Sequence, residues 1–162
     1  TYPGQVLLEG TNLSEGRGTT QPFEVVGAPF LDPEELCERA SGLPLPGVQF
    51  LPTRFRPAFD KWKGESCGGV SLHVTAAEAF RPYRTTVALL AAVRQSRPAQ
   101  FAWLDPPYEY ETVKPPIDII SGSSKLREML DGMETLEDVL LDELSAARDA
   151  DWWTRVRKHL LY

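Results

Sequence analysis

Proline and glycine are concentrated in the first half of the chain, whereas the second half carries most of the helical periodicity. The prolines and glycines separate short apolar runs, which are typical of short strands and turns. Strands followed by helices favour an α+β fold over a regular βαβ alternation. We therefore expect an α+β domain with a small mixed or antiparallel sheet, packed by several helices, and a helical C-terminal half.

Four segments have the pattern of strands. Residues 69–75 are the clearest, because Val70, Leu72 and Val74 alternate with polar residues. Shorter runs predict strands over 5–9 and 23–26. Residues 48–59 are extended, and the prolines at 52 and 57 confine them to a sheet edge or a bulged strand.

Helix signals are clearest at two positions. Asp32 is a good N-cap, Pro33 suits the first helical position and Glu35 occupies the capping-box position, which predicts a helix that ends near 41–42. Pro82 opens a helix that runs to about residue 96 and stops before Pro98.

Three more helical segments are expected in the C-terminal part. One follows residue 123 and ends at Gly132, and another covers 135–147. The last segment places Trp152, Val156 and Leu160 at four-residue spacing, which predicts a stripe that lies in the core or docks against another domain.

Length and charge limit the function. A chain of 162 residues fits one domain, and the start at Thr1 suggests a piece of a longer protein. The net charge of −6 argues against nonspecific binding to nucleic acid or anionic membranes. No apolar run of membrane-spanning length and no signal peptide occur.

The two cysteines, Cys37 and Cys67, do not make a disulfide framework, and we expect unpaired thiols. The chain lacks the clustered Cys and His residues that a zinc site needs. We therefore expect neither a metal nor a cofactor.

The segment from Gly10 to Gln21 has three glycines and no apolar periodicity, so it is predicted to be a loop. Its glycines let the backbone turn tightly and approach a ligand closely. Arg17 has the donor geometry for a carboxylate. Short hydrogen-bonding residues that suit sugar hydroxyls surround it: Thr11, Asn12, Ser14, Thr19 and Thr20.

Two acidic residues border or lie in this loop. Glu9, at the end of a predicted strand, could act as acid or base, but orienting Arg17 is the favoured role, and Glu15 lies within the loop. The alternative is a structural loop in which Arg17 pairs with Glu15 or Glu9 and the hydroxyl groups cap turns. A phosphate-binding loop is disfavoured, because the G-x-x-x-x-G-K-[ST] pattern is missing.

Other polar and aromatic residues give weaker signals. His73 lies on the polar face of its strand, where a structural role is favoured over a catalytic or ligand-binding one. Arg81 precedes a helix and could reach a pocket or form a surface ion pair. Trp62 could stack on a sugar or cover the core. A polar turn and a Pro-rich loop complete the set: Lys61, Lys63, Glu65 and Ser66, then Trp103, Tyr108 and Tyr110.

The run from Leu8 to Thr20, with Pro22-Phe23-Glu24 and Gly27-Ala28-Pro29, closely resembles the NamZ-type exo-β-N-acetylmuramidases. The resemblance extends over nearly the whole chain. Further matching segments are Gly64 to Val70, His73-Val74-Thr75, Phe101 with Trp103, Ile117-Asp118 and Leu160-Leu161-Tyr162.

The resemblance covers only the C-terminal domain of that family. It implies an N-terminal Rossmann-like domain of the same chain, an active-site cleft between the two domains, and a catalytic glutamate on the missing domain. Such enzymes release N-acetylmuramic acid from the non-reducing end of peptidoglycan fragments. A bacterial cell-envelope location, periplasmic or secreted, and a part in cell-wall recycling follow as expectations.

The resemblance names N-acetylmuramic acid as the ligand. We hypothesise that Arg17 binds its lactyl carboxylate, with threonine and asparagine groups on the acetamido and hydroxyl positions. We expect Glu9, Thr11, Asn12, Glu15, Arg17, Thr19, Thr20, His73 and Arg81 to bind substrate. Glu9 or Glu15 could supply the second carboxylate that glycosidases usually use. A noncatalytic carbohydrate- or protein-binding module and a purely structural cap remain open as alternatives.

Overall fold

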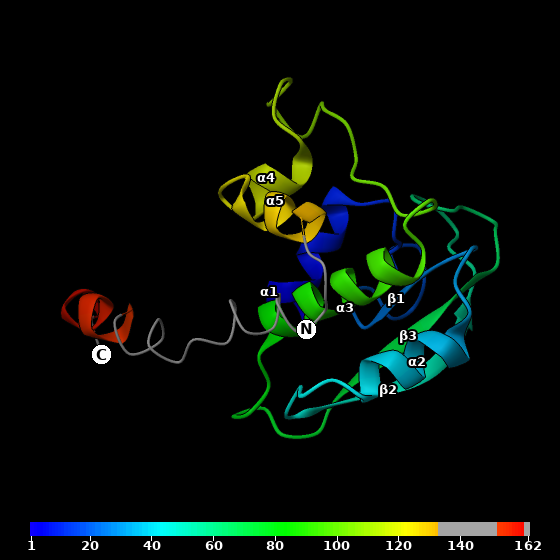
Figure 1. The fold of residues 1–162 in the computed structure, drawn as a ribbon, viewed down its shortest axis with the longest axis horizontal. Coiled ribbons are helices and arrows are strands. Elements are labelled where there is room, and N and C mark those ends of the chain that lie inside the picture. The colour runs from blue at the N-terminus through cyan, green and yellow to red at the C-terminus, as the bar shows by residue number, and fades with distance from the viewer. Residues whose placement is uncertain (133–151, 161–162) are drawn as a thin grey trace.

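The structure, a computed structural model, describes residues 1–132 and 152–160 of the chain (Figure 1). Its sheet has three antiparallel strands in the order β1-β3-β2. The strands are β1 (Val25–Ala28), β2 (Val48–Phe55) and β3 (Cys67–Val74). The α+β prediction with a small antiparallel sheet is therefore confirmed.

The other described elements are helices. They are α1 (Tyr2–Gln5), the 3-10 helix η1 (Val6–Gly10), α2 (Pro33–Ser41), α3 (Pro82–Ser96), α4 (Pro116–Ile120), α5 (Lys125–Gly132) and the 3-10 helix η2 (Arg157–His159). α2 packs on β2 and β3, and α3 packs on α1 and α2. Figure 1 shows α3 between the sheet side of the molecule and the pair α4 and α5. Residues 85–93 of α3 are all buried, so this helix is the centre of the core.

The N-terminal segment is helical, and the prediction of a strand over 5–9 is wrong. Leu7 and Leu8 are adjacent and both buried, so their side chains do not alternate between core and solvent. The helix lies directly on α3: a Cβ on Gly4 would lie 2.0 Å from the carbonyl oxygen of Pro82. Residues 5–9 are too few for their hydrophobic pattern to distinguish a strand from a helix, and packing against α3 determines the helical form.

The strands over 48–59 and 69–75 are confirmed with different ends. β2 is an edge strand, which is where a sheet tolerates Pro52. β1 starts later than the predicted residue 23, because Phe23 has a positive φ of 63° and cannot belong to a strand. Val74 is exposed and Ser71 is buried, against the predicted alternation, because only the first six residues of β3 are covered.

The predicted helices are confirmed at α2, α3 and α5. Asp32 caps α2 by accepting a hydrogen bond from the backbone nitrogen of Glu35 at 2.9 Å. The Glu35 carboxylate does not return to the cap. It pairs with Arg97 at 2.5 Å and with Arg39 at 3.1 Å, and so links α2 to the end of α3.

Other helical predictions have mixed outcomes. α4 was not expected, and the helix over 135–147 lies outside the described residues. Residues 152–156 are helical and continue into η2. Trp152 and Leu160 are about half exposed, so their stripe is not part of the core of the described chain. None of the helices in the described ranges has the length and apolar character to cross a membrane.

Both cysteines are unpaired thiols, as predicted. Cys67 is fully buried at the start of β3. Burial raises the pKa of its thiol to about 11, and the nearby carboxylate of Glu65 adds to the shift. Cys37 on α2 is partly exposed, and its sulfur donates to the carbonyl oxygen of Phe50 at 3.3 Å.

The contact between β1 and β3 leaves no room for a side chain at Gly69. A Cβ there would lie 1.9 Å from the carbonyl oxygen of Val26. We expect Gly69→Ala to lower the free energy of unfolding by roughly 3 kcal/mol, because the two strands must separate to admit the methyl group. Urea unfolding measures this change. Gly42→Ala is the matched control, since its Cβ meets only ordinary contacts at 3.5 Å. Equal midpoints for the two variants would contradict the expectation.

Candidate functional site

The loop after η1 is held in place by its backbone. Ser14 and Gly27 of β1 exchange two backbone hydrogen bonds, at 2.8 and 3.0 Å. Gly16 and Gly18 have φ values of 82° and 77°, a region that glycine adopts without strain. The carbonyl oxygen of Gly18 accepts a hydrogen bond from the nitrogen of Ala58 at 2.8 Å. The loop is therefore fastened to β1 on one side and to the segment after β2 on the other.

This geometry brings Glu9, Glu15 and Arg17 together. Arg17 Nη2 lies 2.5 Å from Glu9 Oε1, and Arg17 Nε lies 3.1 Å from Glu15 Oε1. The side chains differ in exposure: Arg17 is 40% exposed, Glu9 15% and Glu15 2%. Asp60 stands at the margin, with Oδ2 4.0 Å from Arg17 Nε. The pairing expected for a structural loop is thus present, yet the guanidinium still reaches the surface.

Lys61 is a further member of the cluster formed by Glu9, Glu15 and Arg17. Its ammonium donates to the carbonyl oxygens of Leu8 at 2.7 Å and Leu13 at 2.9 Å, and to Glu15 Oε2 at 2.8 Å. One side chain thereby joins the end of η1, the loop and the buried carboxylate. Lys61 lies in the polar turn noted in the sequence, but nothing in its spacing indicates this role.

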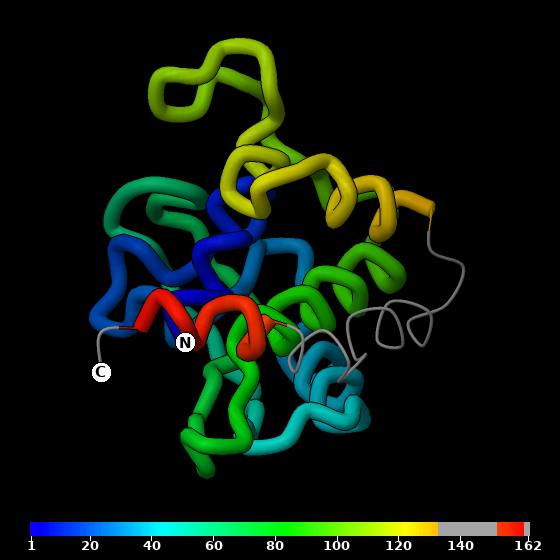
Figure 2. Tube along the Cα trace, turned by 90° about the vertical axis from the view of Figure 1, so that its left-hand side faces the viewer, coloured from blue at the N-terminus to red at the C-terminus, as the bar shows by residue number. Residues whose placement is uncertain are grey.

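Tyr108 reaches the same cluster from the Pro-rich loop that projects beyond α4 in Figure 2. Its hydroxyl donates to Glu9 Oε2 at 2.8 Å. Burial raises the pKa of Tyr108 to about 12, and the hydrogen bond to Glu9 adds to the shift. Both oxygens of Glu9 are therefore engaged, one by Arg17 and one by Tyr108. This supports a role for Glu9 in orienting its neighbours.

The guanidinium of Arg17 is fixed on two sides. The hydrogen bond to Glu9 raises the pKa of Arg17 above its usual value, so the group stays charged. Its Cζ atom lies 5.0 Å from the ring centroid of Phe23, a cation–π distance. Within the described part of the chain, Glu9, Glu15 and Asp60 contact only Nη2 and Nε. Nη1 is the donor group that remains for a ligand.

The small polar residues of the loop bond mainly to backbone. Thr11 is fully buried, and its hydroxyl donates to the carbonyl oxygen of Leu8. Asn12 binds both Gln100 and Ala102 through its side-chain amide. The Thr19 hydroxyl closes a turn onto Gly16 at 2.6 Å. These three residues shape the loop, whereas Thr20 is exposed.

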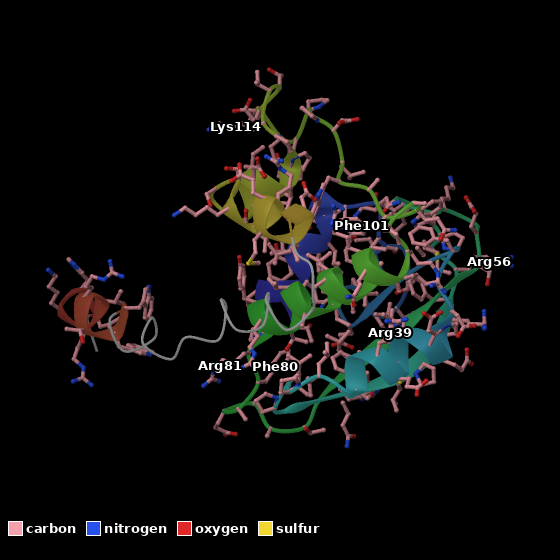
Figure 3. All side chains as sticks on the ribbon, in the orientation of Figure 1. Arg39, Arg56, Phe80, Arg81, Phe101 and Lys114 are labelled. Atoms are coloured by element: carbon pink, nitrogen blue, oxygen red, sulfur yellow. The ribbon has the colours of Figure 1, made fainter. Side chains whose placement is uncertain are left out.

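His73 and Arg81 do not join the charged cluster. His73 is exposed on β3 and lines a hollow of about 290 Å³ with Ser71, Gln21 and Glu24. Arg81 lies beside Phe80 at the start of α3 (Figure 3), and its Nη1 donates to the carbonyl oxygens of Glu78 and Phe80. The expectation that these two residues bind the same ligand as Arg17 stays a prediction without support from their contacts.

The aromatic residues considered from the sequence separate into two groups. Trp62 packs against the core and Phe30, and its indole nitrogen donates to the carbonyl oxygen of Asn12 at 2.6 Å. Trp103 is similarly tied down, to Asp131 at 2.8 Å. Tyr110, by contrast, is fully exposed. Trp62 thus has the core-covering role. Over the described residues no group of His, Cys, Asp and Glu is arranged to hold a metal ion.

Comparisons with known proteins identify the family of the chain. A family model described as "Exo-beta-N-acetylmuramidase NamZ, C-terminal" matches residues 1–162. The chain belongs to this family. It is 36% identical over 139 residues to the peptidoglycan β-N-acetylmuramidase NamZ of Bacillus subtilis, covering 86% of this chain and 32% of that protein. The chain therefore spans about a third of that relative.

Two solved structures from Bacteroides fragilis, both of DUF1343 family proteins, have the same fold. One matches with a TM-score of 0.79 and 25% identity, over 99% of this chain and 41% of that chain. The other has a TM-score of 0.56 and 21% identity, over 99% and 39%, and supports the fold alone.

Glu15 should be essential for the stability of the loop. We expect Glu15→Gln to lower the free energy of unfolding by roughly 3 kcal/mol, because it removes the buried charge that faces Lys61 and Arg17. Chemical denaturation at neutral pH measures the change. Glu38→Gln on the exposed face of α2 is the control for loss of one negative charge. If both variants unfold alike, the buried pair does not stabilise the fold.

Tyr108 should remain protonated in the native protein at about pH 11, where an ordinary tyrosine with a pKa near 10 is mostly ionised. Because the folded pKa is raised to about 12, the stabilisation from its hydrogen bond is present below the unfolded pKa and is lost as the pH rises through the folded value. Native wild-type protein and Tyr108→Phe should therefore show the same tyrosinate absorbance at about pH 11. A lower absorbance for the variant would show that Tyr108 titrates normally.

Proposed function

We propose that this chain is the C-terminal, substrate-binding domain of an exo-β-N-acetylmuramidase. The full-length protein would release N-acetylmuramic acid from the non-reducing end of peptidoglycan fragments in the bacterial cell envelope, periplasmic or secreted. Membership of the NamZ family supports this reaction class. The binding role rests on one observation: the charged, partly exposed guanidinium of Arg17 is held by Glu9 and Phe23 in the loop after η1.

The chemistry of the ligand suits this arrangement. N-acetylmuramic acid carries a carboxylate on a lactyl ether, and an arginine N–H donor is a strong partner for a carboxylate. Glu9 and Phe23 fix the guanidinium before the ligand arrives, so little conformational entropy is lost on binding. In this proposal Nη1 donates to the lactyl carboxylate.

The local charge balance limits what this half-site does alone. Glu9, Glu15 and Asp60 carry three negative charges, and Arg17 and Lys61 carry two positive charges, so the cluster has no positive surplus. An anionic ligand is held here by directed hydrogen bonds rather than by net attraction. We therefore expect an N-terminal domain of the full-length protein to supply a further cationic group and the catalytic acid, with the sugar bound in the cleft between the two domains.

Glu9 and Glu15 have different roles in this scheme. Glu15 is buried between two cations and does not reach a ligand. Glu9 is partly exposed, but Arg17 and Tyr108 occupy its two oxygens. Both act as positioning residues for Arg17, and the reaction itself depends on groups of the other domain.

The decisive experiment uses steady-state kinetics of the full-length protein on a β-glycoside of N-acetylmuramic acid. Arg17→Ala should raise KM about tenfold or more with a smaller change in kcat, because one hydrogen bond to a charged group is lost. Arg54→Ala is the control, since Arg54 is exposed and pairs with the exposed Glu34 at 3.6 Å. An unchanged KM for Arg17→Ala at unchanged stability would refute the assignment.

The isolated chain separates the alternatives. A substrate-binding half predicts negligible hydrolysis by residues 1–162 alone and activity only in the full-length protein. Tight binding of muramic-acid glycosides by the isolated chain, with no dependence of activity on Arg17, would instead favour a noncatalytic binding module. Loop variants that change stability but neither binding nor kinetics would favour a structural cap.

A further inference from the structure

An exposed phenylalanine stands beside the Arg17 cluster. Phe59 is 58% exposed, although it precedes Asp60, whose carboxylate faces Arg17. Its backbone lies against the loop: a Cβ on Gly18 would be 2.7 Å from both the nitrogen and the oxygen of Phe59. A partly exposed ring next to a polar ligand site can bury an apolar part of that ligand.

The segment that carries Phe59 is strongly constrained. Asp60 and Trp62 have φ values of 68° and 58°, which are rare for residues other than glycine. Lys61 between them is anchored by three hydrogen bonds, and Trp62 is anchored to Asn12. Backbone strain that the surroundings hold in place is concentrated at functional sites. The turn thus holds the backbone of Phe59 next to Gly18.

The other exposed apolar residues do not share this setting. Leu51 is 50% exposed on the edge strand β2. Tyr110 and Val113 lie in the loop between Pro107 and α4. Among the described residues near Arg17, Tyr2 is also exposed, but it packs edge-on against Phe23 at 4.7 Å. Phe59 is thus next to Asp60 in the chain, whereas the ring of Tyr2 is in contact with Phe23.

The chemistry of the ligand determines what Phe59 meets. In a lactyl ether the carboxylate and a methyl group are bonded to the same carbon atom. A ligand whose carboxylate lies on Arg17 Nη1 therefore places that methyl group within reach of the residues that flank Arg17. A phenyl ring removes such a methyl group from water, whereas Glu9, Glu15 and Asp60 cannot.

We propose that Phe59 is the specificity residue that recognises the lactyl methyl group of the substrate, next to the carboxylate bound by Arg17. This inference rests on the proposed function. It assigns the two halves of the lactyl group to two side chains: the anion to Arg17 and the methyl to Phe59. The turn at 57–64 sets the spacing between them.

The test compares two substrates of the full-length protein: a β-glycoside of N-acetylmuramic acid and its 3-O-carboxymethyl analogue, which keeps the carboxylate and lacks the methyl group. The wild-type kcat/KM should favour the methyl-bearing substrate by about fourfold, as expected for one buried methyl group. Phe59→Ala should bring the ratio close to one and leave the rate on the analogue nearly unchanged. Leu51→Ala, which also truncates an exposed apolar residue, should retain the wild-type ratio.

The outcomes are distinguishable. If the wild-type protein hydrolyses both substrates and Phe59→Ala keeps the wild-type ratio, the role of Phe59 is wrong while the proposed function stands. If Phe59→Ala slows both substrates equally and lowers the melting temperature, Phe59 is a packing contact, and the inference fails. A ratio lost in Tyr2→Ala but kept in Phe59→Ala also overturns it. If the wild-type protein hydrolyses neither glycoside, the proposed function fails, and the inference fails with it.

Discussion

The ammonium group of Lys61 donates two hydrogen bonds to backbone carbonyl oxygens, those of Leu8 and Leu13, and one to the carboxylate of Glu15. The carbonyl of Leu8 also accepts from the backbone nitrogen and the hydroxyl of Thr11, whereas the carbonyl of Leu13 would otherwise need water or another donor. The Lys61 cation satisfies the Leu13 carbonyl and neutralises the buried Glu15. The path of the chain from η1 to β1, and with it the position of Arg17, depends on this contact.

Two carboxylates of the same cluster illustrate how environment assigns roles to identical chemical groups. Glu15 is inaccessible and holds cations on two sides, so it contributes to the fold. Glu9 lies nearer the surface between a guanidinium and a phenol, so it contributes to the geometry of the guanidinium. The site is a rigid surface that presents few donors. Such a surface is suited to complete a cleft with a second domain rather than to react alone.

The sequence predicted the elements whose signals are local. The cap at Asp32 and the prolines at 33 and 82 located α2 and α3, and Pro52 indicated an edge strand. The helix after Thr1 could not be predicted from the sequence, because it depends on the close packing of Gly4 against α3. In the site, the pairing of Arg17 with Glu9 and Glu15 was within reach, since all three are close in sequence. Lys61 and Tyr108 come from 46 and 99 residues away from their partners Glu15 and Glu9, and no spacing rule indicates such contacts.

The unequal environments of the two cysteines have a practical consequence. The thiol of Cys67 is sealed in the sheet and has a pKa of about 11, so at neutral pH it is neither accessible nor ionised. Cys37 is partly exposed on α2, a helix that the Glu35–Arg97 ion pair links to the end of α3. Within this chain, a maleimide dye or spin label would therefore attach selectively at Cys37 without mutagenesis. In the full-length protein, a second label on the proposed N-terminal domain would allow the distance between the two domains to be measured.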